Sequence, residues 1–308
     1  RRMEGRFSTQ SVREARLGYL RACAEMEAAV RREMQALCAE LEPCLPALSV
    51  AAHWSLIFSS LSAHVGCAMM KRWSLPCLQG VDSDDRRMSV VGCWPYWLPR
   101  SSAAPNSFDW SGLWLLTAPN MAGKSSLLRG TLAAALLANV GLFAPLEEGS
   151  IIPRFDAFFL RTASFDIPSE GKSAFAQEMD DVAILASECG PRSLIMLDEL
   201  GRGTSAREGS ALGVALLEWL AKNSMGAIFA THLHEMEGLL AADQNSLPGL
   251  RRVTMDVSVD ASTGRVRMGY TLRDGSCNDS LALHTAATAG VPPEILSRAA
   301  EILKDGAA

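Results

Sequence analysis

The apolar run Leu113-Trp114-Leu115-Leu116 leads directly into Thr117-Ala118-Pro119-Asn120-Met121-Ala122-Gly123-Lys124-Ser125-Ser126. A strand, a tight turn and then Gly-Lys-Ser at the start of a helix is typical of a phosphate-binding loop. Backbone N–H groups of such a loop point inward and bind phosphate oxygens, aided by the helix N-terminus. We expect Lys124 to reach the β- and γ-phosphates and the Ser125 hydroxyl to coordinate Mg²⁺.

The loop departs from the usual pattern at its first position, where Ala118 stands in place of glycine. Alanine fits there if its φ is negative, whereas a positive φ would cost about 1–2 kcal/mol. Surface loops also contain Gly-Lys-Ser, so the loop alone leaves an ordinary surface turn open as an alternative.

A second motif, Leu194-Ile195-Met196-Leu197-Asp198-Glu199, is a short apolar run that ends in two carboxylates. Such a run indicates a buried strand of a parallel sheet, and ligands of open α/β sheets bind at the carboxyl ends of the strands. We expect Asp198 to hold Mg²⁺ and Glu199 to orient the attacking water. The alternative is a strand that ends in a solvated acidic turn.

A third strand is predicted over residues 227–231, with His232 at its carboxyl end. That position suits a sensor of the γ-phosphate, although a histidine after an apolar strand is often incidental. From residue 113 onward, predicted strands and helices alternate, which indicates an α/β fold with a mostly parallel sheet.

The composition limits the class of protein. The chain has 308 residues, is 48% hydrophobic and carries a net charge of −5, so it is not a basic nucleic-acid clamp by composition. The eight cysteines form no C-x-x-C pair, which favours a reducing compartment with buried thiols. The apolar stretch 132–144 is too short to span a bilayer. We expect this stretch to form the helix that follows the loop. We expect no membrane partner.

Four segments are predicted along the chain. Residues 1–70 form a helical segment with helices over 11–41 and 47–70, and residues 71–112 connect it to the rest through short strands. Residues 113–275 form the nucleotide-binding domain, which closes with an antiparallel hairpin over 252–272. Residues 276–308 form two helices whose apolar face we expect to dock onto a partner subunit.

These motifs together resemble the ATPase domain of MutS-type DNA mismatch-recognition proteins. The resemblance is carried by the loop, by Leu-Asp-Glu-Leu-Gly-Arg-Gly-Thr-Ser, by Phe-Ala-Thr-His, by Gly-Lys-Ser-Ala-Phe-Ala-Gln-Glu-Met at 171–179 and by Ala-Gly-Val-Pro at 289–292. Pro-Tyr-Trp at 95–97, Thr-His-Leu-His at 231–234 and Gly-Ser-Cys-Asn-Asp-Ser-Leu-Ala at 275–282 resemble the organellar branch of plants and algae. The chain departs from the family at Ala118, Ala122 and Ala174.

The resemblance implies a Mg²⁺-dependent P-loop ATPase of the ABC-ATPase type, preceded by clamp and lever helices. It implies Lys124, Glu199 and His232 as catalytic residues and Ser125 and Asp198 as metal ligands. It implies that Ser173 reaches the γ-phosphate of a second subunit, and that Tyr270 stacks on adenine. Ordinary alternatives are a helix N-cap for Ser173 and an inward-facing hairpin tyrosine for Tyr270. The ATP-binding residues as a set are Ala118, Pro119, Asn120, Met121, Ala122, Gly123, Lys124, Ser125, Ser126, Ser173 and Tyr270.

The function so implied is ATP binding and hydrolysis that switches a homodimer or heterodimer on mismatched DNA, with DNA contacted mostly by domains outside this chain. The expected location is intracellular: mitochondrion or plastid by the branch resemblance, otherwise nucleus or cytoplasm. An alternative is a nucleotide-gated interaction module with little hydrolysis. A transporter-type domain is disfavoured because Leu-Ser-Gly-Gly-Gln does not occur, and a degenerate domain that binds no nucleotide is the remaining alternative.

Overall fold

The structure is a computed structural model that describes residues 9–80, 85–162, 173–201, 203–232, 234–242, 247, 249–259, 266–277 and 281–305. The chain divides into two compact units, Arg1–His64 and Val65–Ala308, which are described separately. Residues 171, 172, 202, 233 and 278–280 of the motifs quoted above lie outside the described residues.

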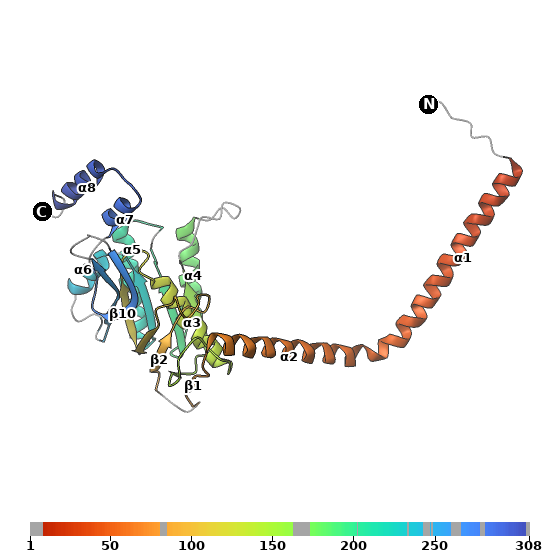
Figure 1. Cartoon of the computed structure of the whole chain (residues 1–308), viewed down its shortest axis with the longest axis horizontal. Helices are drawn as coiled ribbons and strands as arrows, with labels where there is room; N and C mark the ends of the chain where they lie inside the picture. The colour runs from red at the N-terminus through yellow and green to blue at the C-terminus, as the bar shows by residue number, and fades with distance from the viewer. Residues whose placement is uncertain are drawn as a thin grey trace, which may run out of the picture. The chain divides into compact units, whose positions relative to one another are not determined.

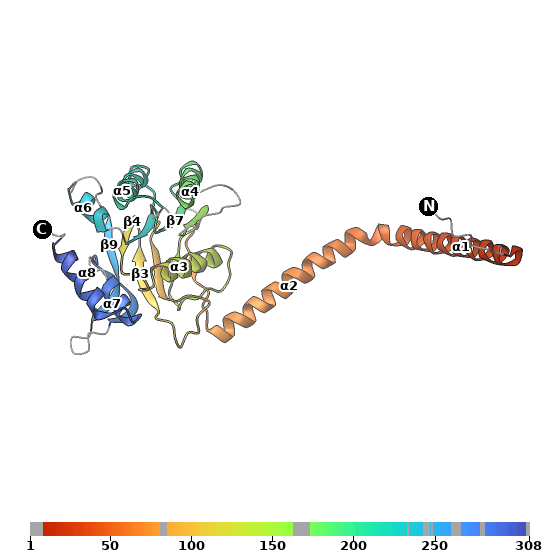
Figure 2. The same ribbon diagram turned by 90° about the horizontal axis from the view of Figure 1, so that it is seen from above.

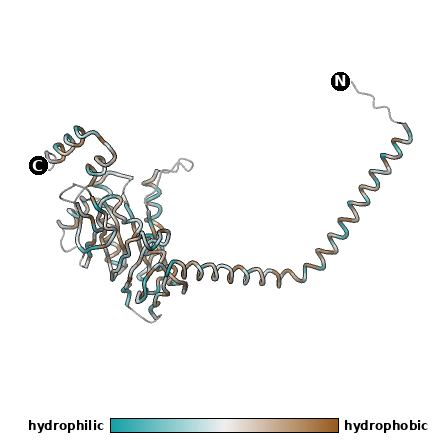
Figure 3. Tube along the Cα trace, in the orientation of Figure 1, coloured by the Kyte–Doolittle hydropathy of each residue, from teal (hydrophilic) through white to brown (hydrophobic). Residues whose placement is uncertain are grey.

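Long helices make up the first unit, as the sequence predicts. Helix α1 spans Gln10–Leu41, the short 3₁₀ helix η1 spans Glu42–Cys44, and α2 spans Leu45–Lys71 and continues into the second unit. Thr9 caps α1, and Pro43 lies in η1, where its missing N–H donor costs nothing. No residue of α1 is buried, although all of its residues are described. The apolar residues that Figure 3 marks along this unit are therefore mostly exposed.

One helical stretch meets the length and composition expected of a membrane span. It lies within Gln10–Lys71, where an 18-residue window has a mean hydropathy of 1.4 and is 0% buried. Only the length and composition of the helix support a membrane span. An apolar helix that packs against another part of a protein has the same length and composition.

Figures 1 and 2 show a sheet with helices on both faces in the second unit. Its six strands have the order β10-β9-β4-β8-β7-β6, and every neighbouring pair is parallel except β10 with β9. The strands are β4 (Leu113–Thr117), β6 (Ala157–Arg161), β7 (Ser193–Asp198), β8 (Ala227–Thr231), β9 (Arg251–Val259) and β10 (Val266–Asp274). The expected mixed α/β fold, the mostly parallel sheet and the closing hairpin are confirmed.

Two hydrophobic cores lie on opposite faces of this sheet. Along β7, Leu194 and Met196 pack into the core that contains α3 (Lys124–Asn139), whereas Ile195 and Leu197 pack into the other. That second core contains residues of α4 (Ala174–Glu188), α5 (Ala206–Lys222) and α6 (His234–Ala242). Because side chains alternate along a strand, a continuous apolar run supplies both cores at once.

A second, four-stranded sheet has the order β1-β5-β2-β3 and packs on the α3 side. It consists of β1 (Cys77–Leu78), β2 (Met88–Cys93), β3 (Asn106–Trp110) and β5 (Ile151–Ile152). The chain closes with α7 (Ala282–Thr288) and α8 (Pro293–Asp305), and Ile295, Ile302 and Leu303 of α8 are exposed. The short strands predicted within 71–112 and the two final helices are both confirmed.

Candidate functional site

The predicted site residues lie together because three adjacent strands, β4, β8 and β7, have their carboxyl ends on the same side of the sheet. Thr117 at the end of β4 pairs with Thr231 at the end of β8, and Asp198 at the end of β7 pairs with Ala230. The loop, the two carboxylates and His232 therefore leave the sheet at one edge. A pocket of about 470 Å³ opens there. Among the residues that line it are Asn120, Met121, Gly123, Lys124, Ser125, Ser126, Glu199 and Tyr270.

The backbone of the loop has the form that its sequence predicts. Gly123 has φ +98° and is the N-cap of α3, and Met121 also has positive φ. Ala118 and Ala122 have negative φ and are buried. Alanine at these two positions therefore adds no backbone strain, and the departure from glycine does not distort the loop.

Lys124 is 5% exposed, and its Nζ donates hydrogen bonds to the carbonyls of Ala118 at 2.6 Å and Pro119 at 3.2 Å. Burial lowers the pKa of Lys124, while the charges of Glu199 and Asp198 oppose that shift. The ammonium group is thus held over its own loop by two carbonyls and is attracted by the carboxylates across the site.

Asp198 is 3% exposed, and burial raises its pKa, while a hydrogen bond with the Ser125 side chain opposes the shift. Its Oδ1 atom is buried and has no hydrogen-bond partner within the described part of the chain. A buried carboxylate oxygen with no donor, next to a hydroxyl, fits a hard divalent cation. The described residues contain no group of three His, Cys, Asp or Glu side chains that could hold a metal, so Mg²⁺ here would need phosphate and water ligands as well.

Glu199 and His232 face each other at the edge of the site. The distance from His232 Nδ1 to Glu199 Oε1 is 3.7 Å, and the Glu199 side chain is 13% exposed. Glu199 has φ +56°, and its backbone N–H donates to the carbonyl of Ala230 on the next strand. A non-glycine residue in this backbone region is strained and persists only where its surroundings hold it, as at many functional sites.

Tyr270 lies at an irregularity of the β9–β10 hairpin, where the register shifts between Met268 and Leu272. Its φ is +56°, and its ring lies next to Gly123. Asn106 holds this irregularity in place, because its side chain donates to the Tyr270 carbonyl and accepts from the Leu272 N–H. Asn106 was missed from the sequence, since no local pattern links it to a residue 164 positions away.

Ser173 is exposed and does not line this pocket. Its side chain accepts a hydrogen bond from the Ala176 N–H and so caps α4, the ordinary alternative considered above. The first turn of α4 packs closely against the loop that follows the carboxylates. A Cβ atom placed on Gly203 of that loop would lie only 2.9 Å from Phe175 of the helix. The cap and the carboxylate loop therefore belong to one packed region.

Residues 114–305 match the protein family described as MutS domain V. The chain belongs to the MutS family. The mitochondrial DNA mismatch repair protein MSH1 of Arabidopsis thaliana is 34% identical over 304 residues, which cover 95% of this chain and 26% of that protein. The DNA mismatch repair protein MutS of Chloroflexus aurantiacus is 35% identical over 282 residues, 88% of this chain and 28% of that protein. The Thermus aquaticus MutS is 37% identical over 225 residues, 73% of this chain and 27% of that protein.

The similarity to the Arabidopsis mitochondrial protein confirms the predicted resemblance to the organellar branch of the MutS family. This MutS-family chain spans about a quarter of the length of the curated relatives that it matches.

Proposed function

We propose that this chain is the Mg²⁺-dependent ATPase domain of a DNA mismatch repair protein. One observation carries the proposal: a buried lysine on a phosphate-binding loop, a buried carboxylate with an unpaired oxygen and a second carboxylate all meet at one sheet edge. The names of the relatives supply the process, since each is called a DNA mismatch repair protein.

The residues act mainly through position and charge. Backbone donors of the loop, together with Asn120 and Lys124, bind the phosphates, and Ser125 and Asp198 hold the cation. A Mg²⁺ ion held by these two residues would neutralise charge that develops on the phosphates. Glu199 aligns the attacking water, and His232 contacts the γ-phosphate. The exposed ring of Tyr270 stacks on the adenine base.

Hydrolysis would be linked to pairing of two such domains on DNA. Ser173 is exposed at the N-terminus of α4, so a second subunit could meet it there, and α7 with α8 would form the docking segment. We propose that the chain consists of four segments, residues 1–70, 71–112, 113–275 and 276–308. The exposed apolar side chains of α1 and α2 would pack against other parts of the longer protein. The name of the Arabidopsis relative favours an organelle as the location.

Steady-state ATP hydrolysis, measured at increasing concentrations of the chain with Mg²⁺, tests this function. Glu199→Gln should bind ATP normally and lose about 10²–10⁴-fold in turnover, as expected on loss of a group that positions or deprotonates water. Glu218→Gln, at an exposed position on α5, is the matched control and should leave turnover unchanged.

Two outcomes separate the alternatives. Turnover per subunit that rises with concentration and is lost in Glu199→Gln supports a composite dimeric ATPase. ATP binding with negligible turnover, also with mismatched DNA present, supports the nucleotide-gated interaction module instead. Turnover that is equal in Glu199→Gln and the parent chain overturns the role of Glu199.

A further inference from the structure

A second pocket lies at the opposite end of the same strands, where β4, β7 and β8 begin. Leu113 pairs with Ala227 at these amino ends, and Ala227 pairs on its other side with Ile195, near the beginning of β7. The pocket has a volume of about 430 Å³, within the size range of small-ligand sites. It shares no lining residue with the phosphate-loop pocket. Strands of five residues separate the two sites by about 17 Å.

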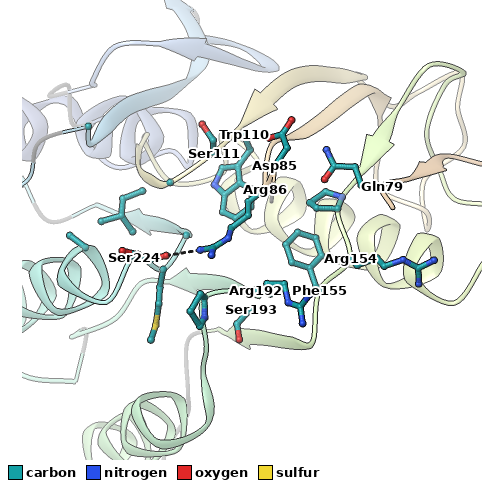
Figure 4. A pocket seen from close by; sticks show the side chains of 18 of the residues that line it. Gln79, Asp85, Arg86, Trp110, Ser111, Arg154, Phe155, Arg192, Ser193 and Ser224 are labelled. Atoms are coloured by element: carbon teal, nitrogen blue, oxygen red, sulfur yellow. Dashed lines mark hydrogen bonds between the residues drawn. The ribbon is translucent and has the colours of Figure 1, made fainter. Parts of the chain in front are cut away.

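The rim of this pocket is positively charged. Arg86, Arg154 and Arg192 line it, and Asp85 is the one carboxylate among the described lining residues. Arg86 Nη1 donates to the carbonyl of Ser224 at 3.1 Å, a bond that fixes one side of the guanidinium and leaves its other donors open (Figure 4). Within the described residues Arg192 has no ion pair and no side-chain hydrogen bond, and Figure 4 shows Arg154 extended away from the other labelled side chains. Arg86 and Arg192 are thus available to bind an oxyanion.

The floor of the pocket is apolar and contains one unsatisfied donor. Trp110 is 2% exposed and its Nε1 atom has no hydrogen-bond partner among the described residues. Its ring lies so close to Gly226 that a Cβ there would be 2.8 Å from Cη2. Phe155 lies beside it, with ring centroids 6.3 Å apart. A buried N–H without an acceptor is unfavourable.

We propose that this pocket binds a small organic anion with a flat apolar body. Its phosphate or carboxylate group is bound by Arg86 and Arg192, and its ring packs against Phe155 and the wall formed by Trp110. Each part of the ligand matches a separate feature of the pocket. The charge matches the arginines at the rim, the ring matches the aromatic side chains, and the volume of about 430 Å³ suits a small molecule.

Nuclear magnetic resonance of the ¹⁵N-labelled indole groups tests this site in the intact chain. Trp110→Phe assigns the Trp110 Nε1–H signal, and the remaining six of the seven tryptophans report whether that variant is folded. Phenyl phosphate, benzoate, inorganic phosphate and benzyl alcohol are titrated in turn. We expect phenyl phosphate or benzoate to shift the Trp110 signal saturably, inorganic phosphate to bind more weakly, and neutral benzyl alcohol to give no shift. A preference between the two ring-bearing anions identifies the oxyanion.

Variants separate this pocket from the phosphate loop. Arg192→Gln and Arg86→Gln should each weaken binding by about tenfold, as expected for the loss of a charge-assisted hydrogen bond. Arg207→Gln, at an exposed position on α5, and Lys124→Ala, in the phosphate loop, should leave the titration unchanged. The proposal is overturned if no probe shifts the Trp110 signal, if the arginine variants bind as the parent does, or if Lys124→Ala abolishes the shift. None of these outcomes depends on ATP hydrolysis, so the proposed ATPase function can fail while this site stands.

Discussion

The ring of Tyr270 lies against Gly123 at the start of α3: a Cβ built on Gly123 would be 3.1 Å from Tyr270 Cδ1. Gly123 also has φ +98°, so two independent constraints require glycine there. The contact joins the phosphate-binding loop to the hairpin β9–β10, which are far apart in the sequence, and forms one wall of the candidate nucleotide pocket.

Gly123→Ala should therefore lower ATP affinity by at least about tenfold, through about 1–2 kcal/mol of backbone strain and displacement of the Tyr270 ring. Gly149→Ala is the matched control, because Gly149 has φ +91° but nothing within 4 Å of a Cβ. Isothermal titration calorimetry with ATP and thermal unfolding separate the two effects. We expect both variants to lose stability and only Gly123→Ala to lose ATP affinity; an equal loss of affinity in both would contradict the contact.

Tyr270 itself should contribute to ATP affinity through its ring. The side chain is 48% exposed and borders the pocket, so Tyr270→Ala should weaken ATP binding by about 2–10-fold, the range of a stacked aromatic pair. Tyr270→Phe keeps the ring and should bind ATP as the parent chain does. If Phe and Ala weaken binding to the same extent, the hydroxyl rather than the ring is responsible, and the stacking assignment fails. GTP gives a further check, since stacking alone discriminates weakly between purines.

Asp198 should destabilise the ligand-free chain at neutral pH. Burial raises its pKa above the usual 3.8, so the folded state binds this proton more tightly than the unfolded state does. The free energy of unfolding therefore falls as pH rises from about 3.8 through the raised pKa, and the deficit persists at pH 7.

Asp198→Asn should accordingly raise the unfolding free energy at pH 7 and flatten this part of the pH profile, while Mg²⁺-dependent turnover is lost. Urea unfolding between pH 3 and pH 8 measures the profile. Asp109→Asn, at an exposed position on β3, should change stability by less than about 0.5 kcal/mol. A variant at 198 that is less stable than the parent at pH 7 would show that ionised Asp198 is favourable in the fold.

A buried charge network behind the site gives another prediction. Glu178 Oε1 forms an ion pair with Arg161 Nη2 at 2.8 Å, and Glu178 Oε2 accepts a hydrogen bond from the Gly201 N–H at 3.0 Å. The Arg161 and Glu178 side chains are 5% and 2% exposed. Glu178→Gln removes the buried carboxylate that pairs with the buried Arg161 charge. We therefore expect this substitution to lower the free energy of unfolding by about 3–5 kcal/mol.

Asp181 offers a matched comparison within the same network. It contacts Arg161 Nε at 3.2 Å but is 45% exposed, so Asp181→Asn should cost no more than about 1 kcal/mol. Chemical denaturation of the two variants beside the parent chain measures both. Similar losses from the buried and the exposed partner would mean that burial does not set the strength of this network.

The sequence predicted those parts of the fold that depend on neighbours in the chain. Gly123-Lys124-Ser125 and Asp198-Glu199 follow buried strands, as the sequence predicts, because a continuous apolar run precedes each of them and parallel strands bring their carboxyl ends to one edge. Their roles in nucleotide binding and hydrolysis stay predictions. The long helices α1 and α2 followed from periodicity and prolines in the same way. Tyr270 was assigned by resemblance alone, since nothing in the hairpin's alternation places its ring beside Gly123.

Tertiary structure decided what no local pattern contains. The negative φ of Ala118, the bonds from Asn106 that hold Tyr270, and the charged pocket around Trp110 all arise from segments that are distant in the sequence. The sequence by itself determined the strand–loop–helix unit and the residues available for chemistry, because short-range backbone and hydrophobic preferences govern these. The pairing of Tyr270 with the loop and the second pocket depend on how the layers pack, since only packing brings distant side chains within contact distance.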